Sequence, residues 1–400
     1  MTILRKLLGL LLVAGLIVGL ALLAGPSPKP VPAAKTAPAP SRVALPPGTT
    51  TVTALRAAAG GGQFAGTLVN VQDLVSEGTP LTLTYPGASY VKVHFNRLLL
   101  LPGEYVTVTD RSGGQLSTYR FGVSARWAMS VDGDTAVVTM HGRLAHVLID
   151  QVARGFTPAE QARQADADQA RWKAAVAAMG SRACPTGQTA PAACYQTTDP
   201  VAYKGSRAVA RLLIGGTELC TAWRVGPNDR MLTSHHCFAT SADARDVEVW
   251  FGYACPVCDG TGAAPPVKVY GDAVLATDAT LDYTLFTVQD FGTISGFGYL
   301  TMDTRAPGPG ERVYIPQYPS GQPLSIAEDA GGDCAVDAPA VDGYGPGTDV
   351  SYRCDTAAGS SGAPVLSRIS NKVIAMHHFG GCPDAGVRTD LIAQKVAGLL

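Results

Sequence analysis

The sequence predicts an all-β protein with more than one folded unit, and three observations lead to this fold class. The chain of 400 residues exceeds the size of one typical domain, so two folded units with tails are expected. Its 45 glycines and 28 prolines indicate frequent turns. Between those turns lie short runs rich in valine, threonine and tyrosine, which favour strands. The formal net charge of −1 lacks the basic excess of nucleic-acid-binding proteins, so no nucleic-acid partner is expected.

Residues 1–24 have the pattern of an export signal. Arg5 and Lys6 give a basic start, and residues 7–23 form an apolar run. The run ends in Leu-Leu-Ala, a poor cleavage site, and is just long enough for a marginal membrane anchor. Because no stop-transfer charges follow, we favour removal, with membrane contact only if the segment is retained. In either case the rest of the chain is predicted to be secreted or otherwise extracytoplasmic. Residues 25–48, rich in proline and alanine, predict an extended linker.

Residues 49–155 predict a small β-sandwich-like N-terminal domain. Val91, Val93 and Phe95 alternate with polar residues such as Lys92, as a half-buried strand would. Several further strands at similar spacing are typical of a sandwich. No chemistry is visible in this segment. Its scattered histidines are expected on a surface or a sheet face rather than on a metal, and they are His94, His141 and His146.

Residues 156–183 predict a helical connector. Thr157 and Glu160 fit a capping box, with Pro158 at the first helical position. The alanine-rich, charged run that follows reaches Gly180, a natural C-terminal stop.

The cysteines indicate an oxidising compartment and a third segment, residues 184–400, that is stapled by disulfides. They are Cys184, Cys194, Cys220, Cys237, Cys255, Cys258, Cys334, Cys354 and Cys382. The odd number leaves one thiol free or paired between chains. Cys255 and Cys258 begin a C-x-x-C-x-G-x-G zinc-knuckle pattern, but the chain has no second C-x-x-C pair. Disulfide pairing is therefore preferred, and no metal or other cofactor is expected.

A candidate nucleophile lies in the sequence Gly359-Ser360-Ser361-Gly362-Ala363-Pro364. The glycines suit a tight turn that a substrate backbone can approach closely. Such a turn would expose the Ser361 hydroxyl and direct the N–H groups of Gly359 and Ser361 into one space, where they could hold an oxyanion. A serine hydroxyl alone is a poor nucleophile, so the hypothesis requires a base and an orienting group elsewhere.

Both partners can be found upstream. His236 stands in Thr233-Ser234-His235-His236-Cys237, at the end of an apolar run, and Asp282 stands at the start of a β-type run. His236 is preferred to His235 as the base because it directly precedes the cysteine. In this hypothesis, Ser361 attacks a carbonyl and His236 takes and returns the proton. Asp282 orients the imidazole.

The order His236, Asp282, Ser361 and the three surrounding motifs resemble those of the chymotrypsin-like serine peptidases. In motif style they are most similar to bacterial lysyl endopeptidase, and the resemblance covers residues 184–400. It implies two six-stranded antiparallel β-barrels with the active site between them, and hydrolysis of polypeptides through an acyl-enzyme. Ser360 departs from the family, because many members have an aspartate there that pairs with a freed N-terminal amine.

The resemblance also implies disulfides. The family links the strand before the catalytic histidine to the cysteine after it, which here are Cys220 and Cys237. Similarity to lysyl endopeptidase pairs Cys194 with either Cys255 or Cys258, and Cys184 with Cys382, which leaves Cys334 with Cys354.

Primary specificity is predicted from the same resemblance. The sequence from His377 to Cys382 resembles the strand that lines the specificity pocket, and either His377 or His378 matches the pocket histidine. Asp384 and Asp355 are competing candidates for a carboxylate at the pocket floor, with slight preference for Asp384. Such a carboxylate would select Lys or Arg through a charge-assisted contact.

The sequence therefore predicts an exported serine endopeptidase. Its N-terminal domain is hypothesised to be a propeptide that assists folding or masks the site of a zymogen, or alternatively a permanent binding module. A peptidase-fold binding protein without turnover and an esterase on the same fold are the rival functions.

Overall fold

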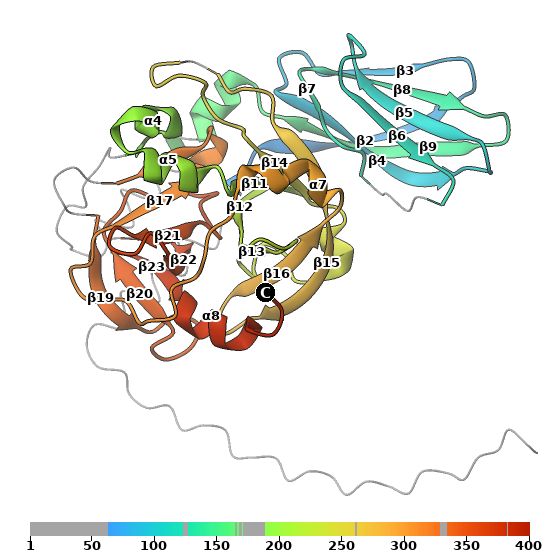
Figure 1. The fold of residues 1–400 in the computed structure, drawn as a ribbon. Coiled ribbons are helices and arrows are strands. Elements are labelled where there is room, and N and C mark those ends of the chain that lie inside the picture. Colours follow the sequence, from blue (N-terminus) through green and yellow to red (C-terminus); the bar gives the residue numbers. More distant parts are fainter. Residues whose placement is uncertain are drawn as a thin grey trace, which may run out of the picture. The chain divides into compact units, whose positions relative to one another are not determined.

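A computed structural model describes residues 63–122, 127–164, 166–167, 170, 189–260, 262–328, 334–381 and 383–400 (Figure 1). The predicted export signal and linker, residues 1–48, lie outside the described residues. Among the helices that are described, none combines the length and the apolar character needed to span a membrane.

The N-terminal domain is a sandwich of two four-stranded antiparallel sheets, as predicted. One sheet has the order β2 (Gly66–Val75), β9 (His146–Gly155), β4 (Tyr90–Leu99), β7 (Val131–Asp132). The other has the order β3 (Leu81–Thr84), β8 (Thr135–His141), β5 (Tyr105–Asp110), β6 (Leu116–Arg120). Their shared core includes Val93, Val108 and Ile149, which are fully buried.

The alternation predicted for β4 is only half correct. Val91, Val93 and Phe95 are buried in the sandwich core, but Lys92 between them is also fully buried. The outward face of this strand is covered by another part of the chain, which a strand pattern alone does not reveal.

The predicted capping box of the connector is confirmed where it is described. The Thr157 hydroxyl accepts from the Glu160 N–H at 3.3 Å, and the Glu160 carboxylate accepts from the Thr157 N–H at 2.8 Å. Residues 158–164 are helical. The remainder of the predicted helix, from residue 171 to Gly180, lies outside the described residues.

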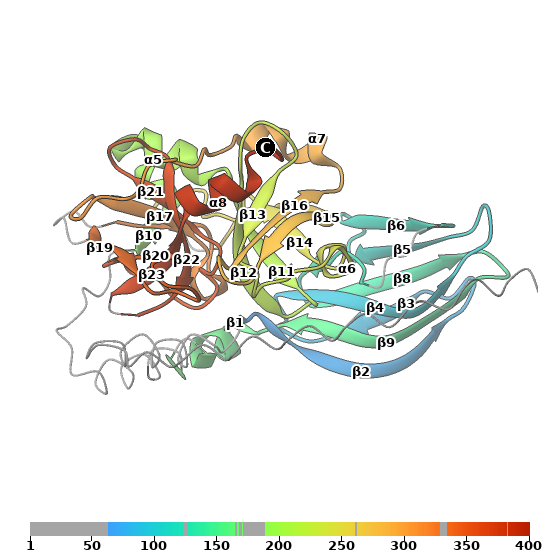
Figure 2. The same ribbon diagram turned by 90° about the horizontal axis from the view of Figure 1, so that it is seen from below.

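A closed six-stranded antiparallel barrel follows. Its strands are β11 (Val209–Ile214), β12 (Glu218–Arg224), β13 (Met231–Thr233), β14 (Glu248–Phe251), β15 (Val267–Asp278) and β16 (Tyr283–Val288). The short β13 pairs with both β16 and β12, and this double pairing closes the barrel. The two-residue strand β1 (Gln63–Phe64) adds to the outer edge of β12 (Figure 2). Leu212, Phe251 and Phe286 fill the interior.

The second β unit is an antiparallel sheet that forms a half-barrel. Its strand order is β10 (Thr189–Pro191), β18 (Ser325–Ala327), β17 (Val313–Gln317), β21 (Pro364–Ser367), β22 (Val373–Phe379), β23 (Asp384–Arg388), β20 (Asp349–Tyr352), β19 (Val336–Val341). A core shared with the first barrel joins Leu232 and Leu285 to Leu366 and Met376. The expected chymotrypsin-like two-barrel fold is thus observed, with its second barrel open.

Short helices connect and cover these strands. They are η1 (Ala192–Cys194), α4 (Tyr195–Thr198), α5 (Pro200–Ser206), α6 (Ser241–Ala244), α7 (Phe291–Ile294), η2 (Ser295–Phe297), η3 (Pro319–Gly321) and α8 (Thr389–Val396).

Three disulfides staple this part of the chain. Cys220–Cys237 and Cys334–Cys354 are confirmed. Cys194 pairs with Cys258, the second of its two predicted partners, so among the described cysteines Cys255 carries the free thiol. The predicted pair Cys184–Cys382 lies outside the described residues.

Candidate active site

The loop that carries Ser361 joins β20 to β21 and depends on two glycines. Gly359 and Gly362 have φ values of +94° and +89°, a region that residues with a Cβ rarely adopt. A Cβ on Gly362 would lie 2.1 Å from the Thr221 carbonyl oxygen, so only glycine fits there. Ser360 is fully buried, whereas Ser361 is partly exposed. The local sequence therefore turns the second serine, not the first, toward solvent.

Strand β12 holds this loop beside the histidine loop. The Thr221 N–H donates to the Ser361 carbonyl at 2.8 Å, and the Thr221 hydroxyl donates to the Gly359 carbonyl at 2.9 Å. The hydroxyl of Thr233 in turn donates to the Thr221 carbonyl at 2.8 Å. Thr233 ends β13, three residues before His236. One strand thus anchors two loops that are far apart in the sequence.

His236 and Asp282 are in direct contact. The Nδ1 atom of His236 lies 2.8 Å from Oδ2 of Asp282, and the His236 N–H donates to Oδ1 at 2.9 Å. The two contacts fix both the ring and the backbone of the histidine. Asp282 is almost fully buried and has a φ of +43°, a strained backbone for a residue with a Cβ. His235 instead places its Nδ1 2.8 Å from the Thr277 hydroxyl, so of these two neighbours it is the ring of His236 that contacts Asp282.

Ser361 and His236 are not hydrogen-bonded to each other in this structure. Among the described residues, the Ser361 hydroxyl forms no hydrogen bond to His236 or to any other group. In enzymes without substrate such contacts are often long and tighten only in the reactive complex.

Two backbone donors are free beside Ser361. Within the described part of the chain, the N–H groups of Gly359 and Ser361 donate to no protein acceptor. The N–H between them, that of Ser360, donates to the Ala357 carbonyl at 3.0 Å. The Ser360 hydroxyl accepts weakly from the Ala357 N–H at 3.4 Å. Ser360 therefore closes the turn internally and makes no ion pair.

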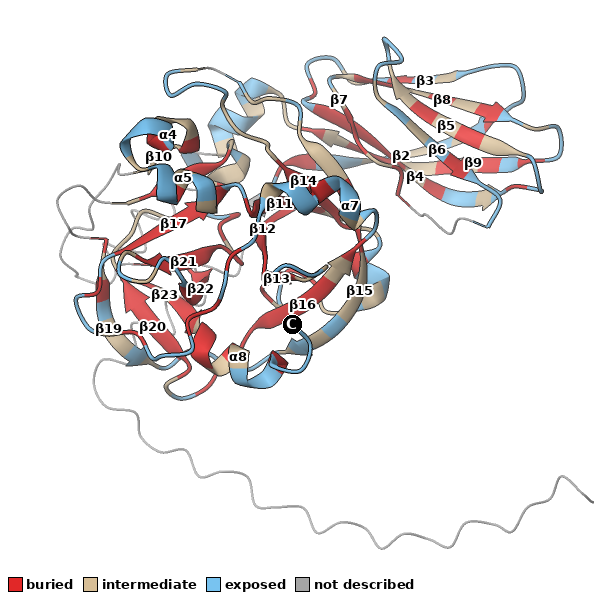
Figure 3. Ribbon diagram, in the orientation of Figure 1, coloured by how far each residue is buried: buried red, intermediate tan, exposed pale blue. Residues whose placement is uncertain are grey.

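A second histidine contacts Asp282, and sequence reasoning missed it. His378 on β22 places Nδ1 2.9 Å from Oδ2 of Asp282, and its Nε2 lies 2.5 Å from Oδ2 of Asp349 on β20. Its ring is fully buried, and Figure 3 shows both strands as buried. Burial lowers the pKa of His378, but the charges of Asp349 and Asp282 outweigh burial and raise it to about 9.

The two histidines together determine the ionisation of Asp282. Burial alone would raise the pKa of this carboxyl, but the hydrogen bonds from His236 and His378 outweigh burial and hold the pKa below its usual value. Asp282 is thus a carboxylate at neutral pH.

Neither histidine of the predicted pocket faces substrate. His378 is turned toward Asp282, and His377 is buried with Nδ1 2.7 Å from the Tyr352 hydroxyl. Burial, with smaller contributions from His378 and His236, lowers the pKa of His377 to about 3, so its ring is neutral. Both rings are thus buried and hydrogen-bonded within the protein, and recognition of lysine by either of them stays a prediction.

The two pocket carboxylates differ in exposure. Asp384 is 2% exposed, and it accepts from the Gly381 N–H at 2.6 Å and from the Thr356 hydroxyl at 3.0 Å. Burial is the main cause that raises the pKa of Asp384 well above its usual value, with a further contribution from the charge of Asp355. Asp355 is partly exposed, and its Oδ2 accepts from the Thr189 hydroxyl at 3.2 Å. The slight preference for Asp384 is therefore reversed, because only Asp355 presents an accessible carboxylate.

One grouping has the residue types of a metal site but not the chemistry. Ligand atoms of Cys220, His236 and Cys237 lie within 4.8 Å of one another. Both sulfurs are joined in a disulfide and offer no thiolate. Cys258 of the zinc-knuckle pattern is likewise joined to Cys194.

Residues 220–376 match the family model described as a trypsin-like peptidase domain. The match spans the His236, Asp282 and Ser361 motifs and supports a chymotrypsin-like fold and the class of serine peptidase for this part of the chain. Similarity to lysyl endopeptidase in particular stays a prediction.

Among curated proteins, the chain is similar to secreted RxLR effector protein 73 of Plasmopara viticola, with 35% identity over 216 residues. The alignment covers 52% of this chain and 53% of the relative, so the chain spans about half the length of that protein.

Two solved structures match part of the chain. An inactive form of Rv3671c from M. tuberculosis H37Rv is 15% identical with a TM-score of 0.35, and the match covers 54% of this chain and 97% of that one. The serine endoprotease from Yersinia pestis is 12% identical with a TM-score of 0.38, covering 50% and 65%.

Proposed function

We propose that this protein is a serine endopeptidase that cleaves polypeptides through an acyl-enzyme, with Ser361, His236 and Asp282 as its triad. The observation that carries the proposal is the arrangement around β12. This strand hydrogen-bonds the Ser361 loop through Thr221, while Thr233 links the same residue to the strand that leads into His236. The loops that carry His236 and Ser361, two residues 125 positions apart in the sequence, are thus anchored on one strand, which supports the proposal.

The chemistry follows from the roles of these groups. Ser361 Oγ bonds to the substrate carbonyl carbon while His236 Nε2 accepts the hydroxyl proton, and Asp282 stabilises the resulting imidazolium. The N–H groups of Gly359 and Ser361 stabilise the oxyanion. The C–N bond then breaks as the proton passes to the leaving amine, and water releases the acyl group by the reverse proton path.

We propose that the substrate residue before the cleaved bond is Lys or Arg, held by Asp355. The partly exposed carboxylate of Asp355 supports this choice over the buried Asp384. Cys354, directly before it, is tied to Cys334, which limits the movement of the carboxylate. An extracytoplasmic location, and with it secreted or surface polypeptides as substrates, is supported by the three disulfides and by similarity to a protein named as secreted.

The test uses purified protein, a fluorophosphonate probe and casein. Wild type should be labelled and should cleave casein, whereas Ser361→Ala should lose labelling and lose kcat by on the order of a millionfold. Ser112→Ala, at an exposed serine of the sandwich, is the matched control and should behave as wild type. Equal labelling of wild type and Ser361→Ala would refute the assignment of the nucleophile.

The rival function is that of a peptidase-fold binding protein without turnover. One observation favours it: Ser361 and His236 form no hydrogen bond with each other. It predicts neither labelling nor casein cleavage by wild type. An esterase on this fold would be labelled and would hydrolyse an activated ester, but it would leave casein intact.

A further inference from the structure

The N-terminal sandwich meets the first barrel through charges that are completely buried. Nζ of Lys92 on β4 lies 2.6 Å from Oε1 of Glu248 on β14, and both side chains have no exposed surface. The same carboxylate accepts from the Ser130 N–H at 2.8 Å and the Ser130 hydroxyl at 2.7 Å. The Trp250 indole N–H donates at 2.7 Å to Oε2 of Glu248, the oxygen that also accepts from the Ser130 hydroxyl. Each oxygen of the Glu248 carboxylate thus accepts two hydrogen bonds.

Further contacts surround this pair. Lys268 on β15 donates to Asp132 of the sandwich at 2.7 Å, and the Tyr90 hydroxyl donates to the Gly216 carbonyl at 2.7 Å. An apolar cluster draws members from both sides, namely Ala65, Tyr90, Trp127 and Ala153 from the sandwich segment and Leu213, Leu219 and Trp250 from the barrel. The contact has an apolar centre and a satisfied polar network, as a stable interface requires.

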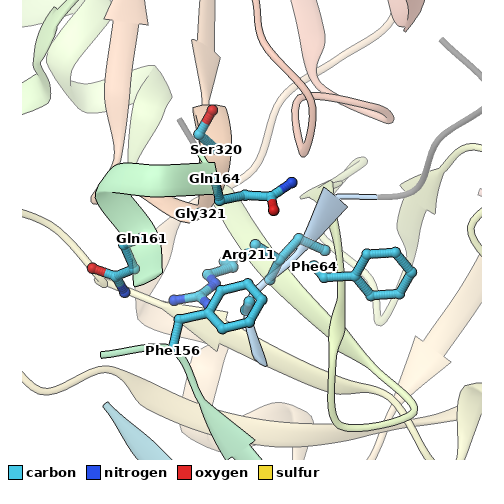
Figure 4. A pocket seen from close by; sticks show the side chains of 9 residues that line it. Phe64, Phe156, Gln161, Gln164, Arg211, Ser320 and Gly321 are labelled. Carbon is cyan, nitrogen blue, oxygen red and sulfur yellow. The ribbon is translucent and has the colours of Figure 1, made fainter. Parts of the chain in front are cut away.

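The pocket drawn in Figure 4 is a small recess at this contact and not at the triad. Phe64, Phe156 and Gln161 line it from the N-terminal side, and Arg211, Leu219 and Gly321 line it from the peptidase side. None of His236, Asp282 and Ser361 belongs to the recess or to the contacts above. Among the described residues, the sandwich therefore contacts β11, β14 and β15 and not the proposed triad.

We propose that the sandwich is a permanent structural partner of the first barrel, which stays bound through the Lys92–Glu248 contact after the connecting chain is cut. It would then be neither a mask over the active site nor a propeptide that dissociates. Its loss would expose Leu213, Leu219 and Trp250 together, an apolar patch that a soluble barrel rarely presents. This proposal does not depend on catalysis.

The test nicks the full chain. A recognition sequence for a site-specific protease is inserted between residues 170 and 189, and the cut protein is passed over a sizing column at physiological salt. Both fragments should elute together. Lys92→Met leaves Glu248 without its buried cation and should weaken retention by on the order of a hundredfold. Lys372→Met, at an exposed lysine of the half-barrel, is the matched control and should leave retention unchanged.

Separation of the wild-type fragments upon cutting would overturn the proposal. If Lys92→Met does not fold, Lys92→Met/Glu248→Gln removes both charges and should recover folding while retention stays weaker than in wild type. Retention equal to wild type in that double variant would show that the charged pair does not hold the contact.

A different observation carries a second inference, which rests on the proposed function. Both ring nitrogens of His378 face a carboxylate oxygen, Asp282 at Nδ1 and Asp349 at Nε2. A neutral imidazole donates from one nitrogen only, so when both carboxyl groups are ionised this geometry requires a protonated ring. Asp282 Oδ2 consequently accepts from two imidazoles, His236 and His378.

The surroundings of His378 contain few other charges. His377, its neighbour on β22, is hydrogen-bonded to Tyr352 of β20, and the ring of Tyr344 packs against His378 edge-on at 5.7 Å. Asp384 on β23 is buried, and its charge acts on Tyr352. His236 contacts the same Asp282 oxygen as His378. Asp282 and Asp349 are therefore the two carboxylates that contact His378.

The geometry assigns His378 the part of a positioning residue that holds Asp282 toward His236 and takes up part of its negative charge. Sharing the charge weakens the attraction between Asp282 and a proton on His236.

Imidazole NMR on the full chain tests this without requiring turnover. In wild type at neutral pH, His378 should show protons on both nitrogens. His378→Gln/Asp349→Asn removes the buried ion pair, and Asp282 should then hold the His236 Nδ1 proton more strongly, which moves the resonance of that proton. His377→Gln removes a neutral buried ring at the next position and should not move it.

A singly protonated His378 in wild type, or a His236 Nδ1 proton resonance that is unchanged in the double variant, would overturn this role. Because the NMR readout does not depend on hydrolysis, an inactive wild-type protein would contradict the proposed function while leaving the test of His378 intact.

Discussion

The N–H of Thr221 donates to the carbonyl of Ser361 at 2.8 Å, so the strand that precedes the histidine loop also supports the nucleophile loop. The same threonine donates its hydroxyl to Gly359 and accepts from Thr233. Its neighbour Cys220 is bonded to Cys237, directly after the base. Two adjacent residues of β12 thus fix both sides of the proposed reaction centre.

Thr221→Val should loosen the nucleophile loop while preserving shape. The carbonyl of Gly359 loses its hydroxyl donor, and the free energy of unfolding should fall by about 1 kcal/mol. If the proposed function holds, kcat should fall with little change in KM, because the oxyanion donors lie in that loop. Urea unfolding and steady-state kinetics check this, with Thr67→Val at an exposed strand position as the control. Unchanged stability and kcat would contradict the anchoring role.

Gly362→Ala should be much more damaging. The new Cβ would meet the Thr221 oxygen at 2.1 Å, and the alanine would have to adopt a φ of +89°. The conformational strain alone amounts to on the order of 1–3 kcal/mol, and the clash adds to it. Thermal unfolding measures the loss. Gly292→Ala is the control, because its Cβ would meet no atom within 4 Å. Equal melting temperatures for the two variants would show that the loop can move away from β12.

Stability should decline between neutral and mildly alkaline pH because of His378. Its pKa is about 9 in the folded protein against an ordinary 6.5, so the folded state binds the proton more tightly. The contribution is complete below pH 6.5 and is lost as the pH rises through about 9. Urea unfolding across this window should show a loss in wild type on the order of 2 kcal/mol larger than in His378→Gln/Asp349→Asn. Parallel pH profiles would indicate that the buried ring is not charged.

Asp355→Asn and Asp384→Asn should affect substrate selection differently. Removing the accessible carboxylate of Asp355 should lower kcat/KM for peptides with Lys or Arg before the cleaved bond by on the order of a hundredfold. Asp384→Asn replaces a buried carboxyl that is 2% exposed and whose pKa burial raises well above its usual value. It should change selectivity little. Cleavage of a peptide library checks both, and a preference that survives in Asp355→Asn would exclude the proposed contact.

The sequence alone predicts the elements whose signals are local. The capping box of Thr157 and Glu160 and the all-β strands can be recognised from the order of residues, since each has a short and specific pattern. The Cys220–Cys237 bond follows instead from the resemblance to the chymotrypsin-like peptidases. The motifs of His236, Asp282 and Ser361 are found in the same way, and their joint role in catalysis stays a prediction. The contact between His236 and Asp282 is present.

Only the tertiary structure decided the burial and the contacts of individual side chains, because these depend on residues that are distant in the sequence. Lys92 occupies a polar position in an alternating strand, yet it is buried, because a second domain covers that face. In β22 a one-residue step reverses the side of the strand, so His378 reaches Asp282 while His377 reaches Tyr352. Strand register and domain packing arise from contacts between distant segments, and a linear pattern contains neither.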